Sequence, residues 1–407
     1  MTRILRVRLG WGIVDQLLSS ASNTLIVFAI APVSSVDEFG AYSLALAALT
    51  TVLAISRGLL GTAINLLSAH LEKLRQEAGY ALSVSVVGGL AAGLLIAVTA
   101  ALAHAPPATY FVALAAPFVL MQDIGRFFCI AAGLPRRAVS SDGVWACGSV
   151  ALLIVTWFSP RMVDAVVLLG GWACVAVLAM LLVLWPQRLI PRISGLRRWW
   201  RNDLRDRVGF GASAVIAATG SFLVLSIAAS IIGVAATAAL LGASSIFGPF
   251  NIVISAMALA VVPELRRRGD VSSMAIWSLL RKIALPTSVL ALAIGGIALL
   301  VPQGWGELIL GDSWTVVRPV LPLTAMEYAA LAWVSAASSG MMTQGRSITL
   351  VKLRLLTSGM SVALGSAVAI VAGSAVAVAG ALVVAAVMAA VYGRLVLLRG
   401  SAHGTVV

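Results

Sequence analysis

Two arginines lie inside stretches that consist mostly of apolar residues: Arg57, within Ser56-Arg57-Gly58, and Arg126. Of the 407 residues, 61% are hydrophobic and 11% are charged, and the mean hydropathy is +1.04. A charge held inside a membrane is costly, so it is usually retained for a task. A guanidinium in such a place suits an anionic substrate, because it forms bidentate bonds with phosphate oxygens and stays charged when desolvated.

Gln122 and Asp123 precede Arg126 in the same apolar stretch. Asp123 and Arg126 are three residues apart, so they can form an ion pair on one helix. Arg126 lies about two turns from the end of that stretch, so its long side chain can instead reach the lipid headgroups. For Arg126, snorkelling, a structural ion pair and substrate binding all stay open. For Arg57 we favour a functional role.

The first apolar stretch carries a polar stripe. Asp15, Ser19 and Asn23 follow one another at intervals of four residues, and Gln16 lies beside them, so these side chains share one side of a helix. The stripe either forms hydrogen bonds between helices, worth about 0.6–2 kcal/mol per contact, or lines a wet cavity. We include Gln16, Asn23 and Gln122 with the two arginines as candidate substrate-binding residues.

Carboxylates inside the apolar stretches are candidates for coupling to an ion. Glu327 lies in the outer half of its stretch without an obvious partner, and its place in the second half of the chain matches that of Asp123 in the first. An intramembrane carboxyl is a candidate proton or cation carrier. We predict that Asp123, Glu327 and Asp15 form the coupling set. Asp15 and Asp142 are expected near helix ends, where solvation is cheap, which makes them weaker candidates.

These side chains must be positioned by membrane helices. A bilayer core about 30 Å thick takes roughly 20 apolar residues per helix, so the chain has room for about a dozen spans. The fold class is therefore all-α and polytopic. We place the spans at 12–32, 41–67, 79–104, 109–132, 142–159, 164–185, 209–232, 237–262, 278–301, 319–341, 349–372 and 374–396.

The net charge of +13 follows the membrane topology. If the N-terminus is cytoplasmic, nearly all Lys and Arg residues fall in cytoplasmic segments, whereas the opposite loops hold Arg161 and Arg318. This distribution obeys the positive-inside rule. It predicts a multi-pass protein of the cytoplasmic membrane with both termini in the cytoplasm, and it attributes the basic charge to topology and anionic lipid rather than to nucleic acid. The preference for Arg over Lys suggests a bacterial source.

The longest expected cytoplasmic connection divides the chain in two. Residues 186–208 contain Trp199 and Trp200 among arginines, which is typical of a segment at the headgroups. We predict an N-terminal six-helix bundle (1–185), this interfacial linker (186–208) and a C-terminal six-helix bundle (209–407). Weak similarity between the halves indicates a parallel repeat, as in transporters that bind substrate between two halves; chance similarity is the alternative.

Sequence signals of enzymes and cofactor proteins are missing. The chain has no P-loop, HExxH or GxSxG motif, and its three cysteines show no disulfide or metal spacing. We therefore expect no enzyme activity, cofactor or metal. Asp37-Glu38, expected in the first outer loop, is similar to the acidic pair of membrane glycosyltransferases, but the short loops leave no outer domain to hold an acceptor.

Several segments together resemble the Wzx-type oligosaccharide flippases of the multidrug/oligosaccharidyl-lipid/polysaccharide (MOP) superfamily. The resemblance covers nearly the whole chain, without one sharp motif. It is carried by Gly10-Trp11-Gly12, Asp37-Glu38-Phe39-Gly40-Ala41-Tyr42-Ser43, Gln122-Asp123 with Arg126-Phe127-Phe128, Gly133-Leu134-Pro135-Arg136-Arg137, Asp142 with Trp145, and Leu310-Gly311-Asp312-Ser313-Trp314.

The resemblance implies two six-helix bundles in the MATE-like arrangement around a cavity that opens to either side in turn. It also implies transport of a polyprenyl-diphosphate-linked oligosaccharide for cell-surface polysaccharide synthesis, with Arg57 and Arg126 meeting the diphosphate. The expected partners are that lipid-linked oligosaccharide, membrane lipids and polysaccharide-biosynthesis proteins, and we expect a monomer. The alternatives are a drug or cation antiporter of the same superfamily and, less favoured, a membrane glycosyltransferase or polymerase.

Overall fold

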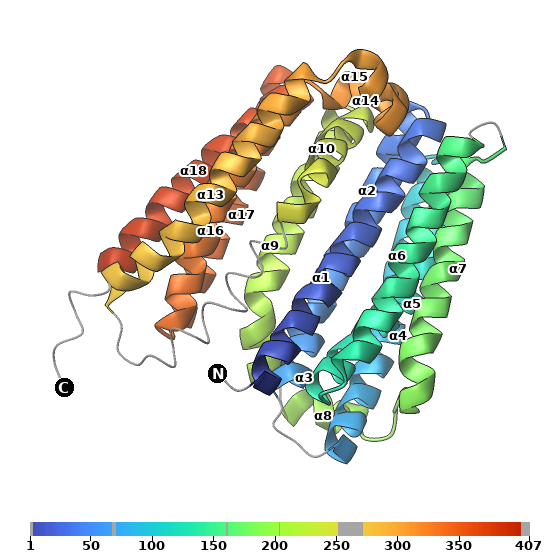
Figure 1. Ribbon diagram of the computed structural model, residues 1–407, viewed down its shortest axis with the longest axis vertical. Helices are drawn as coiled ribbons and strands as arrows, with labels where there is room; N and C mark the ends of the chain where they lie inside the picture. Colours follow the sequence, from blue (N-terminus) through green and yellow to red (C-terminus); the bar gives the residue numbers. More distant parts are fainter. Residues whose placement is uncertain (1–2, 67–70, 160–161, 203, 251–271, 400–407) are drawn as a thin grey trace. The chain divides into compact units, whose positions relative to one another are not determined.

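The computed structural model describes residues 3–66, 71–159, 162–202, 204–250 and 272–399. These residues form helices and their connections, with no strand among them (Figure 1). Contacts between Cα atoms divide the chain into two compact units. Unit 1 comprises residues 1–222 with 309–312, and unit 2 comprises residues 223–308 with 313–407.

The expected membrane helices are present. Within the described residues, nine helices are long and apolar enough to cross a membrane, and a bent pair, Gln303–Val317 with Leu321–Thr343 at 88°, adds a tenth if it counts as one span. Two shorter apolar helices, Leu17–Val33 and Ala235–Ile246, overlap the first and eighth predicted spans. The prediction of an all-helical, multi-pass membrane fold is confirmed. The rest of the eighth predicted span, from residue 251 onward, lies outside the described residues.

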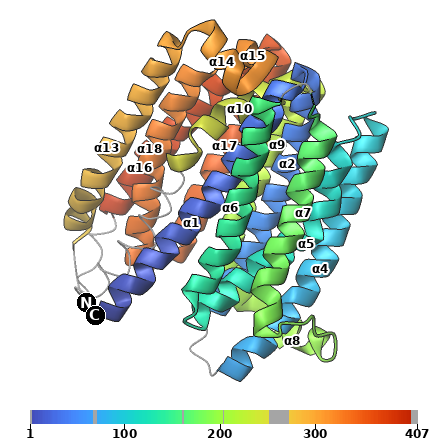
Figure 2. The ribbon, with the colours of Figure 1, turned by 45° about the vertical axis from the view of Figure 1, so that its right-hand side comes forward.

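Unit 1 contains helices α1 to α8 and the first part of α9. Helix α5 is its centre, since it contacts α2, α4, α6 and α7, and Figures 1 and 2 both show α4, α5 and α7 side by side. The bounds are α1 Arg3–Ile30, α2 Val36–Ser56, α3 Thr62–Leu66, α4 Leu71–Leu102, α5 Thr109–Ala131, α6 Pro135–Phe158, α7 Ala165–Leu184, α8 Leu196–Asn202 and α9 Leu204–Ile231.

Glycines bring α4 and α5 into backbone contact. A Cβ atom on Gly89 would lie 2.4 Å from the Cα atom of Pro117, and one on Gly93 would lie 2.4 Å from the carbonyl oxygen of Ala113. Pro117 lies inside α5 and has no N–H group to bond with the Ala113 carbonyl, four residues earlier. The GxxxG spacing of Gly89 and Gly93 therefore serves close helix packing.

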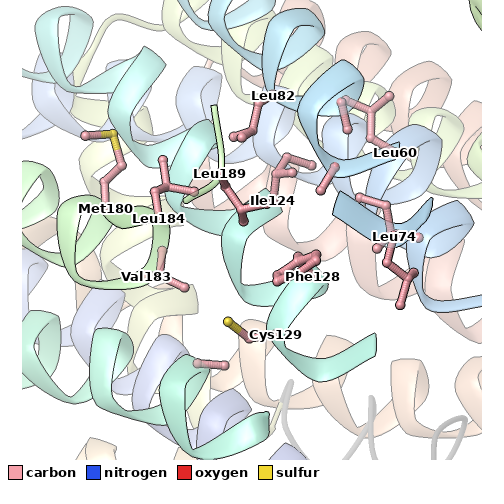
Figure 3. Packing of buried hydrophobic residues seen from close by; sticks show 14 of the residues in the cluster. Leu60, Leu74, Leu82, Ile124, Phe128, Cys129, Met180, Val183, Leu184 and Leu189 are labelled. Carbon is pink, nitrogen blue, oxygen red and sulfur yellow. The ribbon is translucent and has the colours of Figure 1, made fainter. Parts of the chain in front are cut away.

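An apolar core cluster of unit 1 joins α4, α5 and α7 (Figure 3). Leu82, Ile124 and Phe128 are fully buried there, with Val183 from α7. Cys129 belongs to the same apolar cluster.

The acidic pair Asp37-Glu38 corrects one prediction. It lies in the first turn of α2 rather than in a loop, since α2 begins at Val36. Ser35 is the N-cap: its hydroxyl accepts a hydrogen bond from the Glu38 backbone N–H, and the Glu38 carboxylate accepts one from the Ser35 backbone N–H. This reciprocal pattern is a capping box, so the acidic residues have a helix-starting role here.

The connection after α7 is attached to α4. The Arg192 N–H donates to the Gly79 carbonyl at 2.9 Å, and the Ser83 hydroxyl donates to the Arg192 carbonyl at 2.7 Å. Trp199, in α8, is buried with its ring centroid 5.3 Å from that of Tyr80. Part of the predicted linker 186–208 is thus fixed against unit 1.

Unit 2 contains the rest of α9, α10 and α13 to α18. Helix α16 is its centre, since it contacts α10, α13, α17 and α18. Its core joins Ile276 and Leu280 of α13 to Ala336 of α16 and Leu397 of α18. The bounds are α10 Ala235–Ile246, α13 Ser273–Leu300, α14 Gln303–Leu310, α15 Trp314–Val317, α16 Leu321–Thr343, α17 Ser347–Ala372 and α18 Ala375–Arg399.

Candidate functional site

Five charged side chains meet inside unit 1, and they come from four separate segments. Asp15 is on α1, Arg57 is at the end of α2, Asp123 and Arg126 are on α5, and Asp142 is on α6. Four of them are buried, and Arg57 is half-buried. We call these five residues the charged cluster.

Arg57 and Asp123 form the outer pair of the charged cluster. The Nε group of Arg57 donates to both carboxylate oxygens of Asp123 at 3.0 Å, and its Nη2 group donates to Oδ1 at 2.8 Å. The Arg57 side chain is 31% exposed, whereas that of Asp123 is 1% exposed. The buried carboxylate therefore holds one edge of a guanidinium whose other edge, at Nη1, has no hydrogen-bond partner among the described residues.

A local change of helix type positions Arg57. Residues Arg57–Gly61 form one π-helical turn, closed by the Thr62 N–H donating to the Arg57 carbonyl. Single π turns inside α-helices occur frequently at functional sites. The turn fits because two glycines let neighbours approach: a Cβ on Gly58 would lie 3.1 Å from Gly211 Cα on α9, and one on Gly61 would lie 2.6 Å from the Phe127 ring.

Arg126 is the centre of the charged cluster. Its Nη2 group lies 2.6 Å from Asp15 Oδ2 and 3.1 Å from Asp142 Oδ2, and its Nη1 group lies 2.9 Å from Asp123 Oδ1. The predicted Asp123–Arg126 pair is confirmed. Snorkelling of Arg126 to the headgroups is wrong, because three buried carboxylates hold the guanidinium inside the unit.

Gln122 connects the charged cluster to α6. Its amide nitrogen donates to Asp142 Oδ1 at 2.8 Å and lies 2.9 Å from the Ser141 hydroxyl. Ser141 in turn donates to the Ala179 carbonyl of α7 at 2.8 Å. The polar network therefore spans α1, α2, α5, α6 and α7, and buried networks of this kind fix the relative positions of the helices that contribute to them.

The charged cluster has one carboxylate more than it has guanidinium groups. Within the described residues, the buried atoms Asp15 Oδ1 and Arg126 Nε have no hydrogen-bond partner, and Asp142 Oδ2 has only its ion-pair contact with Arg126 Nη2. A buried polar atom without a partner is unfavourable by about 1–3 kcal/mol. The site therefore combines an excess of negative charge with acceptor atoms that a proton or a small cation could use.

The remaining predicted site residues are not members of the charged cluster. Asn23 is exposed on α1, four residues beyond Ser19, whose hydroxyl lies 3.4 Å from Arg126 Nη1. Glu327 belongs to unit 2, on α16, where it has no hydrogen-bond or ion-pair partner among the described residues. Gln16 lies on α1, and its side chain lies outside the described residues.

Two residues of the site are more deeply buried than the sequence indicates. Asp15 and Asp142 were expected near solvated helix ends, but they are 3% and 2% exposed and both contact Arg126. Ser141, beside Asp142, was not recognised. Helix α6 begins at Pro135, seven residues before Asp142, and its first turn carries Arg136 and Arg137. The helix therefore begins before its apolar part, and the Asp142 carboxylate lies deeper in the unit than expected.

The sequence matches no family model and no curated protein. The structure is similar over nearly its whole length to an inward-facing multidrug resistance MATE transporter of the MOP superfamily, with a TM-score of 0.65 and 14% identity, covering 96% of each chain. The lipid II flippase MurJ, in an inward closed conformation, has a TM-score of 0.70 and 11% identity, covering 97% of this chain and 90% of its own.

A third similar structure is a MOP superfamily transporter from Pyrococcus furiosus, with a TM-score of 0.57 and 16% identity, covering 98% of this chain and 95% of its own. At such identities the similarity shows the fold. The chain therefore has the fold of MOP superfamily transporters, as the resemblance predicted, while kinship with the Wzx-type flippases in particular stays a prediction.

Proposed function

We propose that this protein is a membrane transporter that flips a polyprenyl-diphosphate-linked oligosaccharide across the cytoplasmic membrane by alternating access. Two helix bundles, predicted at 1–185 and 209–407, would rock about a central cavity while the lipid tail stays in the bilayer. The fold supports transport, since MATE transporters and a lipid II flippase share it. The choice of a lipid-linked oligosaccharide as the substrate is based on the sequence resemblance and on Arg57.

Arg57 is the single observation that carries the proposal. Asp123 fixes one edge of its guanidinium in a bidentate pair, and Nη1 on the other edge is without a described partner. A guanidinium oriented in this way can give charge-assisted bonds to a phosphate oxygen without losing its anchor. A diphosphate would bind at the exposed edge.

Arg126 then has a positioning role in the proposal. Its guanidinium is 7% exposed and surrounded by Asp15, Asp123 and Asp142, so it orients Asp123, which in turn orients Arg57. The excess carboxylate of the charged cluster makes Asp15 and Asp123 candidates for binding the coupling ion, together with Glu327 in unit 2. In this scheme, binding of a cation would loosen the hold of the carboxylates on Arg57.

The test is glycan export by variants at Arg57 in the native host lacking the chromosomal copy. Arg57→Ala should abolish surface glycan at equal membrane abundance, and Arg57→Lys should restore part of it, because an ammonium keeps the charge but not the bidentate geometry. The measurement is surface glycan on intact cells, with the accumulated lipid-linked intermediate quantified in membrane extracts.

Arg137→Ala is the matched control, because it removes an exposed arginine of the same unit outside the charged cluster. It should export normally. Thermal unfolding of purified Arg57→Ala in detergent separates loss of binding from loss of folding. Normal export by Arg57→Ala at equal abundance would end the diphosphate proposal.

A drug or cation antiporter is the second candidate, and one observation favours it. The charged cluster carries an excess negative charge, which suits a cationic substrate or ion better than a diphosphate. Cells expressing the protein would then resist cationic dyes such as ethidium and expel them, and surface glycan would not change in its absence.

We also propose that both termini are cytoplasmic, as the positive-inside rule predicts. In a background with Cys129, Cys147 and Cys174 replaced by alanine, a membrane-impermeant maleimide should label Gly304→Cys in intact cells and should label Ser194→Cys only after permeabilisation. Both positions are exposed. Ser194 is preferable to Gly195, where φ of +85° would strain a cysteine. The opposite labelling pattern would invert the topology.

A further inference from the structure

Unit 2 carries an open apolar groove on its surface, between α13, α16 and α18. Its volume is about 480 Å³, within the range of about 300–1,000 Å³ that is usual for ligand sites. Ala329, Ala330 and Ala390 form part of its lining, and their small side chains leave room between the larger flanking residues. The groove is separate from the charged cluster, which belongs to unit 1.

The groove opens to the surroundings of unit 2 rather than to its core. Leu292 on α13, Met326 on α16 and Val391 on α18 line it and are 47%, 47% and 55% exposed. In a membrane helix bundle, exposed apolar residues of this kind face lipid. An acyl chain would match this apolar lining.

One end of the groove is cationic. The guanidinium carbon of Arg394 lies 5.8 Å from the ring centroid of Trp277, whose ring is in turn 5.7 Å from that of Trp333. Arg394 is exposed and has no hydrogen bond or ion pair with any described residue. Its N–H donors are therefore available to a ligand, while the tryptophan holds the face of the guanidinium.

The distance between the cationic end of the groove and its apolar part matches that between the headgroup and the acyl chain of a lipid. Val383 and Arg394 both line the groove on α18, and eleven residues at 1.5 Å per residue place them about 16 Å apart along the helix. Trp277 and Trp333 lie toward the arginine end, and tryptophan is enriched at the membrane interface. A molecule that fills the groove thus has its anionic group at Arg394 and its chain along Val383–Val391.

We propose that this groove binds one anionic phospholipid of the surrounding bilayer, with its phosphate on Arg394 and one acyl chain along the α16–α18 face. Basic pockets between membrane helices bind anionic headgroups in this way. The inference is independent of the transported substrate, because it concerns unit 2 alone. It assigns to Arg394 a role that topology by itself does not explain.

Unit 1 provides an internal comparison. A second groove, of about 360 Å³, lies between α4 and α5 and is lined by residues that include Leu90, Leu94 and Phe118, with no charged side chain among its lining. Lipid chains should enter that groove regardless of headgroup. Of these two grooves, the one in unit 2 should therefore be the one that selects an anionic lipid.

The experiment is native mass spectrometry of the purified full chain with phosphatidylglycerol or phosphatidylcholine of identical acyl chains. One phosphatidylglycerol should bind more tightly than phosphatidylcholine by roughly tenfold. Both lipids carry a phosphate, but the choline ammonium of phosphatidylcholine neutralises that charge and competes with Arg394 for it. Arg394→Gln should remove this preference. Arg399→Gln, five residues further along α18, removes the same charge outside the groove lining and should retain the preference.

A second variant keeps the test independent of the folding of Arg394→Gln. Ala390→Leu fills the groove but leaves Arg394 in place, so it should weaken tight binding of the phosphatidylglycerol at this site. Four results would each overturn the proposal. The native chain could bind the two lipids with equal affinity, or Arg394→Gln could keep the preference for phosphatidylglycerol. Arg399→Gln could lose that preference to the same extent as Arg394→Gln, or Ala390→Leu could still bind phosphatidylglycerol as tightly as the native chain.

Discussion

Helices α5 and α16 hold corresponding places in the two units but differ in their chemistry. Each is the helix around which its unit packs, and each carries a carboxylate, Asp123 on α5 and Glu327 on α16. Both helices have 23 residues, but Asp123 follows the start of α5 by about four turns and Glu327 follows the start of α16 by fewer than two, so the predicted match in position is wrong. Asp123 is bonded to two arginines, Arg57 and Arg126. Glu327 has no hydrogen-bond or ion-pair partner among the described residues, and its neighbour Tyr328 stacks on Phe247 with ring centroids 5.2 Å apart.

This difference in ion pairing indicates different roles for the two carboxylates: a structural role for Asp123, and a role in ion binding for Glu327. In unit 1 the carboxylate is part of a network that joins several helices, so a change in its charge must alter the packing of α1, α2 and α6. In unit 2 the carboxylate can change its charge without breaking an ion pair in the described part of the chain. We therefore expect α5 to control the shape of unit 1, and α16 to offer a site where ion binding is less tightly tied to folding.

Asp123→Asn should have the largest effect on stability. It removes the charge that Arg57 and Arg126 share, so it weakens several charge-assisted hydrogen bonds at once, each worth about 1.5–3 kcal/mol, although Arg126 keeps Asp15 and Asp142 as partners. We expect a marked fall in the thermal midpoint of the purified protein in detergent and a loss of transport. The measurement is thermal unfolding monitored by tryptophan fluorescence, with membrane abundance scored in parallel.

Asp164→Asn is the control for Asp123→Asn. Asp164 is an exposed N-cap whose carboxylate accepts a hydrogen bond from the Val167 N–H at 2.9 Å, and asparagine is also a good N-cap. It should change the thermal midpoint little. If Asp123→Asn is as stable as Asp164→Asn, the charged cluster does not hold unit 1 together and the contrast with Glu327 disappears.

Much of the fold could be predicted because hydropathy marks the membrane spans directly. Some helix starts could not, since hydropathy reports where lipid begins and not where a helix begins. The third span was predicted from residue 79, whereas α4 starts at Leu71 and carries Glu72, Lys73 and Arg75 on its first turns. The start of α2 was predictable in principle, because Ser35 and Glu38 have capping-box spacing.

The candidate site was predictable only where it is local in sequence. Asp123 and Arg126 are three residues apart on one helix, so their pairing follows from helical geometry. The pair of Arg57 with Asp123 joins residues 66 apart, and it depends on how α2 packs against α5. The π turn at Arg57 had no clear sequence signal, although Gly58 and Gly61, which permit it, were visible.

Gly89→Ala should have the second-largest effect, and it tests a further difference between the units. Its Cβ would lie 2.4 Å from Pro117 Cα and 2.8 Å from Pro117 N, which are backbone atoms of α5. In unit 2, a Cβ on Gly295 would lie 2.3 Å from the Cβ of Ala325 on α16. Both substitutions should destabilise by about 1–3 kcal/mol through overpacking, measured as thermal midpoints.

The two glycines should differ in how they can be rescued. Ala325→Gly removes the atom that Gly295→Ala meets, so the double variant should regain most of the lost stability. No side-chain substitution removes the backbone of residue 117, so Gly89→Ala should resist rescue. Gly88→Ala and Gly296→Ala are adjacent controls with nothing within 4 Å and should be neutral or slightly stabilising. If the double variant with Ala325→Gly stays as unstable as Gly295→Ala, the methyl group of Ala325 is not what sets the distance between α13 and α16.

Glu327→Gln should have the smallest effect on stability and the most informative effect on transport. The amide replaces a carboxylate that has no described ion-pair partner, so we expect a thermal midpoint close to that of the native chain, and much closer than that of Asp123→Asn. Transport should then lose its dependence on an ion gradient while the protein stays folded. The measurement is transport by reconstituted protein with and without a proton or sodium gradient, with Glu307→Gln on the exposed helix α14 as the matched control. Full gradient-dependent transport by Glu327→Gln would remove Glu327 from the coupling set. A loss of stability as large as that of Asp123→Asn would contradict the contrast between the units, because it would show that Glu327 stabilises unit 2 as strongly as Asp123 stabilises unit 1.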